Sequence, residues 1–294
     1  MVKNEIFDIP FRLASFTKND INYTAEIYTL INPEDTPYKG RVILLHNPGE
    51  DVALYKRTIE RFSLTGYETF FYQMKKHYKN EDEITREMNR IIKICVDDLD
   101  QLKNIPNHKI HLVGNFITGT KALNYTINGR FRYRIKSVVS INPLIDPTSM
   151  FNRNSFINKS ISLTSKIRPS VKLKYTNTSI TSNQEFLNYL ENQNYDLSFM
   201  NFNDLKYLNK IISKISKIKY IQASDKIKNL FIIQSKQNKF IEIENTRIFF
   251  DRIQPLPELS RFVIYEKGKA NLFLENDEIF QSLMNDILDW FEYN

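Results

Sequence analysis

The sequence predicts an α/β protein whose central, mainly parallel sheet is covered by helices on both faces. Short runs of β-branched residues and leucine alternate with amphipathic helical patterns over residues 41–145, and this alternation resumes at residue 228. Such alternation is typical of parallel sheets, because each crossover places a helix on a face. One polar stretch interrupts it. We therefore expect an α/β core from residues 1–147 and 223–294, with a helical lid insertion over 148–222.

Each predicted element has a local reason. RVILLH, residues 41–46, is an apolar run that ends in the turn sequence NPGE, which predicts a buried strand. Residues 53–65 carry apolar side chains at helical spacing and stop at Gly66, which predicts a helix. The same reasoning predicts further strands at 68–73, 109–114, 135–145, 228–235 and 261–268, and further helices at 81–103, 119–128, 183–193, 202–215, 244–253 and 277–293.

Composition favours a soluble protein inside the cell. The 294 residues are 41% hydrophobic, enough for a sizeable core. No stretch approaches the roughly 18 apolar residues of a membrane-spanning helix, and the N-terminus lacks the apolar region of a signal peptide. Cys95 is the one cysteine, predicted as a buried helix residue, and excludes an internal disulfide. We therefore expect the cytoplasm or nucleus.

The net charge of +7 allows anionic partners without requiring one. Nucleic acid or anionic lipid on a basic surface is kept as a lesser alternative. The basic loop with Lys75, Lys76 and Lys79, and the stretch KIRPSVKLKY at 166–175, are interpreted as solvated surface.

Several segments, in order, resemble the monoacylglycerol lipase branch of the α/β-hydrolases (serine aminopeptidase S33-like), especially its fungal form. RVILLHNPGE resembles the strand and HGxGE oxyanion loop, HLVGNFITG the nucleophile elbow, NLFIIQSKQNKF the acid-bearing strand and loop, and YEKGKANLFLEND the histidine loop. The resemblance covers residues 20–293. It implies the α/β-hydrolase fold with a lid, and hydrolysis by a serine, a histidine and an aspartate.

The chain departs from that pattern at four positions. Phe116 stands at the nucleophile position, where a phenyl ring offers no lone pair. Asn238 stands for the aspartate and cannot stabilise an imidazolium by charge. Ala270 stands for the histidine, and no histidine follows residue 111. Pro48 stands where the oxyanion loop donates a backbone N–H, which proline lacks. The resemblance therefore implies a catalytically degenerate relative, with no catalytic residue.

Two further expectations concern the elbow. Thr118 replaces a glycine of the motif with a β-branched residue, which predicts that the strained turn has relaxed. A vestigial pocket has no reason to stay hydrated, so Phe116 is predicted to be mostly buried.

The remaining candidate groups are interpreted as structural. His46, at the end of a strand, is predicted to be packed and hydrogen-bonded, and Ser140 to lie within a buried strand. His77 has no partner ligands, and His108 and His111 should point to opposite faces of a strand. No metal motif or phosphate-binding glycine loop is present, so we expect no metal or cofactor.

Three functional hypotheses follow. The first is a noncatalytic pseudo-hydrolase that acts as a protein-interaction or scaffold subunit. The second is a lipid- or acyl-ligand-binding protein that retains the pocket without hydrolysis. The third is a hydrolase with a relocated site. The size of Phe116 favours the first, because its ring should fill the space of an ester carbonyl.

Overall fold

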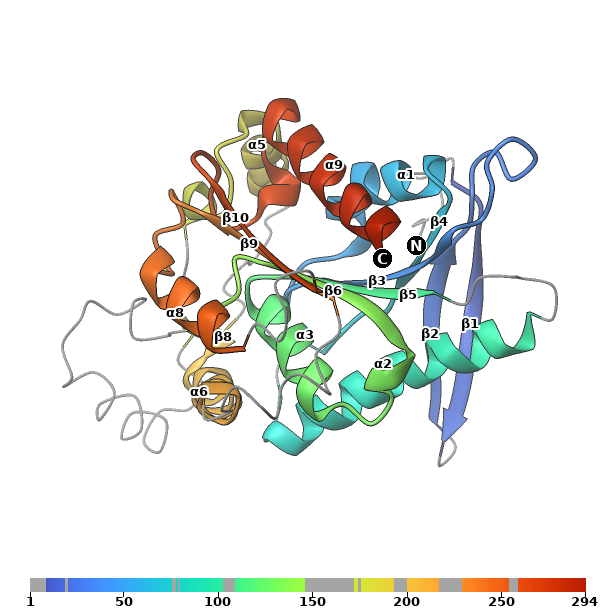
Figure 1. Ribbon diagram of the computed structural model, residues 1–294, viewed down its shortest axis with the longest axis horizontal. Coiled ribbons are helices and arrows are strands. Elements are labelled where there is room, and N and C mark those ends of the chain that lie inside the picture. Colours follow the sequence, from blue (N-terminus) through green and yellow to red (C-terminus); the bar gives the residue numbers. More distant parts are fainter. Residues whose placement is uncertain are drawn as a thin grey trace.

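A twisted eight-stranded sheet forms the centre of the computed structural model (Figure 1). Its order is β1-β2-β4-β3-β5-β6-β9-β10. Strand β2 pairs antiparallel with both of its neighbours, and the other neighbouring pairs are parallel, which confirms the predicted mainly parallel sheet. The strands are β1 (Phe11–Lys18), β2 (Ile21–Tyr28), β3 (Gly40–Leu45), β4 (Tyr67–Phe71), β5 (Ile110–Asn115), β6 (Ile135–Ile141), β9 (Leu230–Ser235) and β10 (Ser260–Tyr265). The structure describes residues 9–18, 21–75, 78, 80–102, 109–145, 172–173, 176–192, 200–216, 229–253 and 259–294.

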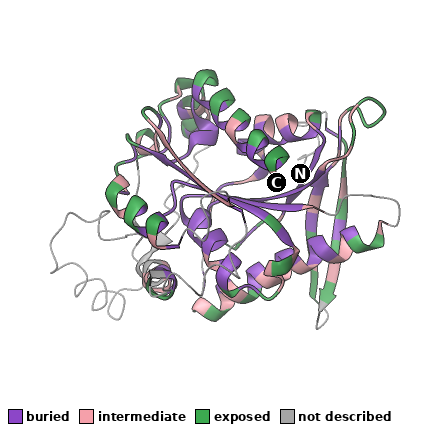
Figure 2. Cartoon of the chain, viewed as in Figure 1, coloured by how far each residue is buried: buried purple, intermediate pink, exposed green. Residues whose placement is uncertain are grey.

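Helices cover both faces of the sheet, as predicted. One face packs against the 3-10 turn η1 (Val52–Tyr55), α1 (Lys56–Leu64) and α9 (Asp277–Tyr293), and the other packs against α2 (Glu81–Gln101), α3 (Ile117–Asn128) and α8 (Ile243–Ile253). The central strands are buried on both faces, whereas the outer sides of the helices are exposed (Figure 2).

The hairpin of β1 and β2 was missing from the predicted elements. Strand β1 exposes Phe11 and Leu13, with 40% and 62% of their surface in solvent, while Ala14 on the opposite face is buried. Large apolar side chains on the solvent face hide the alternation by which a half-buried strand is recognised.

The described part of the predicted insertion is mainly helical. It contains the 3-10 turn η4 (Asn177–Ser179), α5 (Gln184–Asn192), α6 (Phe202–Ser216) and a small antiparallel sheet of β7 (Lys172–Leu173) and β8 (Met200–Asn201). Helix α6 packs against α2 and α3. We call residues 176–192 and 200–216 the cap. Its ends at 148 and 222 stay a prediction, because they fall outside the described residues.

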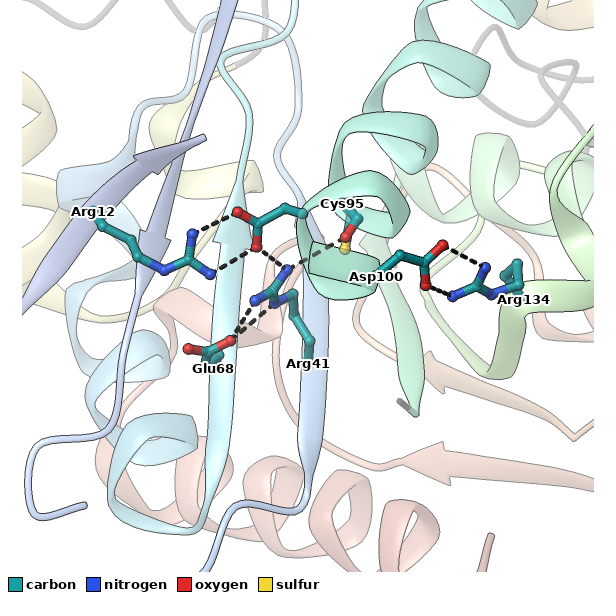
Figure 3. A network of polar contacts seen from close by, with 7 residues as sticks. Arg12, Arg41, Glu68, Cys95, Asp100 and Arg134 are labelled. Atoms are coloured by element: carbon teal, nitrogen blue, oxygen red, sulfur yellow. Dashed lines mark hydrogen bonds and ion pairs between the residues drawn. The ribbon is translucent and has the colours of Figure 1, made fainter. Parts of the chain in front are cut away.

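A partly buried ion network, centred on Arg41, ties the edge hairpin to the core (Figure 3). The Arg41 side chain is fully buried; its Nε and Nη2 donate to Glu68 Oε2 at 3.0 and 2.6 Å, and its Nη1 donates to Asp98 Oδ2 at 2.7 Å. Arg12 donates to both oxygens of Asp98, at 2.5 and 2.7 Å. Burial raises the pKa of Asp98, but the two guanidinium groups outweigh burial and hold it below its usual range. Charge therefore links β1, β3, β4 and α2.

Cys95 lies beside this network and is buried, as predicted. Its carbonyl accepts from Arg41 Nη1, and burial raises the pKa of its thiol to about 12. A neutral thiol at this depth is an apolar core residue and not a nucleophile.

Candidate functional site

Phe116 forms the sharp turn between β5 and α3. Its backbone has φ 56° and ψ −113°, a region that costs a non-glycine residue about 1–3 kcal/mol. Three backbone hydrogen bonds hold it there. The Phe116 N–H donates to Ile141 O at 2.8 Å, and the Phe116 carbonyl accepts from the N–H groups of Thr120 at 3.2 Å and Leu144 at 3.3 Å. The turn is therefore fixed by β6 and the segment that follows it.

The prediction of a relaxed turn was wrong. The Thr118 hydroxyl accepts from the Asn115 N–H at 3.1 Å and lies 3.0 Å from Leu45 O and 2.9 Å from Asn115 O, either of which can take its proton. The substituted threonine thus adds bonds across the turn. Close backbone contact remains at Gly114, where an added Cβ would lie 2.5 Å from the Thr118 carbonyl oxygen.

The Phe116 side chain is 2% exposed, which confirms the predicted burial. Its ring packs against that of Phe240, with centroids 5.4 Å apart. Asn238, two residues before Phe240, is 5% exposed, and its Oδ1 accepts from the Phe240 N–H at 3.0 Å. Its Nδ2 has no hydrogen-bond partner among the residues that the structure describes. The structure therefore brings Phe116 and the Asn238 loop together around an aromatic contact.

The loop that contains Ala270 is covered by the cap. Ala270 is 4% exposed, and its N–H donates to Ser179 O at 3.4 Å. The next N–H, of Asn271, donates to Ile180 O at 2.9 Å. On the other side, Asn142 Nδ2 lies 3.1 Å from the Ala270 carbonyl oxygen. Cap backbone thus lies directly on the position that the sequence resemblance gives to the histidine.

Glu275 strengthens this closure. Its fully buried carboxylate accepts from the Ser182 N–H of the cap at 3.1 and 3.2 Å and from the Lys269 N–H at 2.6 Å. Arg57 donates to the carbonyls of Phe273, at 2.7 Å, and Glu275, while its guanidinium lies 4.0 Å from the Phe280 ring centroid. Hydrogen bonds therefore tie the cap segment at 179–182 to the loop at 269–275.

Sequence reasoning gave no role to Glu50, which organises the loop around Pro48. Its buried carboxylate accepts from the Asn47 N–H at 2.7 Å, the Tyr55 hydroxyl and Asn271 Nδ2 at 3.1 Å. Burial raises the pKa of Glu50, while these hydrogen bonds oppose the rise. The one signal for it was its place at the end of the HNPGE segment. Glu50 therefore joins the loop around Pro48 to the loop that contains Ala270.

His46 is a packed structural residue, as predicted. Its Nε2 accepts from the Met74 N–H at 2.8 Å, so its Nδ1 carries the proton and donates to Asn47 O at 2.7 Å. The ring stacks on Phe71, with centroids 5.0 Å apart. Burial lowers the pKa of His46 to about 4.

His111 is equally enclosed. Its Nδ1 lies 2.7 Å from Ser137 Oγ, its ring stacks on Phe291 with centroids 4.1 Å apart, and burial lowers its pKa to about 3. His77 and His108 lie outside the described residues.

These histidines predict an acid-sensitive fold. A histidine with pKa 6.5 when unfolded and about 3 when folded lets the unfolded chain bind more protons below pH 6.5. The free energy of unfolding should therefore fall as pH falls through this window, with His111 contributing about 2–3 kcal/mol between pH 6.5 and 4.5. Urea denaturation at a series of pH values measures it.

Two variants isolate the contribution of His111. In His111→Leu the decline below pH 6.5 should be smaller by that amount. In Ser137→Ala, which removes the same hydrogen bond but keeps the imidazole, the decline should remain. Equal declines in all three proteins would mean that His111 is protonated in the folded state.

Ser140 is the remaining candidate group that the structure describes. Ser140 is buried within β6, as predicted, and its Oγ packs near Gly119. Among the described residues, no cluster of three or more histidine, cysteine or carboxylate side chains could hold a metal ion. Within the same part of the chain, no helix is long and apolar enough to cross a membrane.

The strand order, the positive φ between β5 and α3, and the helices on both faces define an α/β-hydrolase fold. The chain belongs to the serine aminopeptidase S33 family, whose model matches residues 36–277. The resemblance drawn from the sequence is thereby confirmed at the level of family and fold.

Individual relatives support the same family and fold. The chain is 22% identical over 276 residues to monoglyceride lipase of Saccharomyces cerevisiae, covering 86% of this chain and 85% of the relative. The crystal structure of a soluble variant of that lipase, in complex with a substrate analog, superposes with TM-score 0.81 at 18% identity, over 98% of this chain and 97% of that chain. Monoacylglycerol lipase of Paleococcus ferrophilus superposes with TM-score 0.71 at 15% identity, over 93% and 100% of the two chains.

Proposed function

We propose that this chain is a noncatalytic member of its family and works by binding another protein, as a subunit or scaffold. One observation carries the proposal. The turn that holds the nucleophile in α/β-hydrolases retains its strained backbone, yet Phe116 occupies it and is 2% exposed against Phe240. A buried phenyl ring can neither attack an ester carbonyl nor leave room for one.

Three further positions support the loss of catalysis. Asn238, at the position of the acid, supplies an amide where a carboxylate would be needed. Ala270, at the position of the base, has no titratable group. Pro48 has no N–H for an oxyanion, and losing one such donor alone costs on the order of 10²- to 10³-fold in rate.

The same contacts disfavour the lipid-binding alternative. An acyl ligand in the ancestral pocket would lie beside Phe116 and the loop of Ala270. The ring fills the first place, and hydrogen bonds from the cap at Ser179 and Ile180 close over the second. What the fold still offers to a partner is its outer surface.

The catalytic half of the proposal has a direct test. Purified protein should hydrolyse p-nitrophenyl esters and monoacylglycerols no faster than a heat-denatured sample, and a fluorophosphonate probe should label no serine. Yeast monoglyceride lipase, assayed in parallel, supplies the positive control. Stoichiometric labelling of any serine would contradict the proposal.

The same assay applies to a restored triad. The variant combining Phe116→Ser, Asn238→Asp and Ala270→His should remain poorly active, because Pro48 leaves the oxyanion hole one donor short.

Affinity purification from the native organism tests the proposal that the chain binds another protein. Stoichiometric co-purification of one protein supports it, whereas a bound acyl lipid would favour the alternative.

A further inference from the structure

A basic groove of about 640 Å³ lies on the face of the sheet opposite α1 and α9. Strand β1, helix α2 and the turn after α3 form it. Two aromatic rings and four cations line it, namely Phe16, Phe131, Arg86, Arg90, Lys93 and Arg130. Its volume is in the range of pockets that bind small ligands. It lies apart from the residues around Phe116.

Most of the cations that line this groove have no carboxylate partner in the part of the chain that the structure describes. Lys93 pairs with Asp97, one helical turn away. Among the described residues, no ion pair joins a carboxylate to Arg86, Arg90 or Arg130. Arg86 and Arg90 are four residues apart on one helix, where like charges destabilise by about 0.2–0.5 kcal/mol. An anionic ligand would relieve this repulsion.

Contacts already order these cations. The Arg90 guanidinium lies 3.8 Å from the centroid of the Tyr23 ring. Lys93 lies over Phe16 at 5.3 Å and Arg130 over Phe131 at 5.6 Å. The Arg130 N–H donates to Asn89 Oδ1 at 3.0 Å, which fixes the turn to α2. Stacked guanidinium groups lose less freedom when they bind a carboxylate, so the groove is partly preorganised.

We call the row of cations on α2 from Arg86 to Lys93 the positive strip. Its length favours one kind of anionic ligand. From Arg86 to Lys93 the helix rises about 10 Å. Asp82 precedes the strip on α2 and Asp97 follows it. A nucleic-acid backbone would continue past both ends and meet these carboxylates. Alternate side chains of an extended peptide lie about 7 Å apart, so two or three acidic residues span the strip. Phe16 and Phe131 also line the groove and offer apolar surface to a side chain of such a peptide.

We propose that this groove binds a short acidic segment of the partner protein, whose carboxylates pair with Arg86, Arg90 and Arg130 while an apolar side chain packs on the lining rings of Phe16 and Phe131. This proposal rests on the proposed function and names the surface and partner chemistry that it requires. Arginine suits the role, because its planar fork pairs with carboxylates through two parallel hydrogen bonds.

The test is fluorescence polarisation with a fluorescein-labelled peptide, acetyl-Glu-Glu-Phe-Glu-Glu-amide. The double variant Arg86→Glu/Arg90→Glu should bind it at least about tenfold more weakly than wild type. The control variant Arg247→Glu/Lys239→Glu makes the same charge change at two exposed positions, one on α8 and one shortly before it. Its affinity for the peptide should stay within about twofold of wild type. The Gln analogue of the peptide should not bind, and added NaCl should weaken binding.

Circular dichroism checks that the variants fold, and Arg86→Gln provides a milder change at an exposed position. Equal binding by wild type and the double variant would overturn the proposal. So would binding of a twelve-residue oligothymidylate or phosphatidylserine vesicles in place of the peptide. Ester hydrolysis by the wild type would instead overturn the proposed function, whereas stoichiometric partner capture by the double variant would overturn the groove alone.

Discussion

Replacing Phe116 with serine is expected to lower the free energy of unfolding by about 3–5 kcal/mol. The ring is 2% exposed and packs on Phe240, so the change leaves a cavity. The new hydroxyl would lie in apolar surroundings, which adds the cost of an unpaired polar group. Serine at this turn would also carry the same positive φ, so no strain is relieved. Urea denaturation at pH 7 measures the change.

Phe11→Ser is the matched control. Phe11 lies on the edge strand β1 with 40% of its surface exposed, so the same substitution should cost less than about 1.5 kcal/mol. If Phe116→Ser left stability unchanged but abolished partner binding, Phe116 would be an exposed contact. The interaction surface would then be the region around Phe116, where the family has its active site.

Arg41→Met is expected to destabilise the fold by about 3–5 kcal/mol, because it leaves the buried Glu68 carboxylate without its cation and removes one of the two cations of the partly buried Asp98. Glu68 would lose both guanidinium bonds, and Asp98 would keep only Arg12. Methionine fills most of the volume, so the loss reports charge and hydrogen bonding more than packing. Urea denaturation again gives the value.

The surface pair of Lys39 and Glu292 provides the control. Both side chains are exposed, and Lys39→Met should cost at most about 1 kcal/mol. Acid should narrow the difference between wild type and Arg41→Met. The pKa of Asp98 is depressed in the fold, so its pairing stabilises above its unfolded pKa and is lost as pH falls through the folded one. A cost for Arg41→Met as small as the control would show that the network is solvated.

Periodic elements could be predicted well from the sequence. The helix expected at 277–293 is α9, and the strand expected at 41–46 is β3, because burial on one or both faces leaves a repeating apolar pattern. Burial of Phe116 and His46 followed from the chemistry of their positions.

Contacts between distant segments could not be predicted. Glu50 and Asn271 are 221 positions apart, and Arg12 and Asp98 are 86 apart. No local pattern encodes such pairs. The Thr118 error has the same origin, since its hydroxyl reaches the carbonyl of Leu45 on a neighbouring strand. A threonine that looks disruptive within its own motif is accommodated by a residue from elsewhere.

The positive φ at Phe116 shows that the backbone path of this turn and the chemistry of its side chain are separate properties. Strand β5 must reverse into α3 within a single residue, and bonds from Ile141 and Leu144 impose that torsion whatever side chain is attached. A survey that recognised serine hydrolases by torsion angles alone would count this chain among them. The φ angle at this junction reports the path of the backbone, whereas the functional group of the side chain determines the chemistry. The two can therefore change independently in evolution.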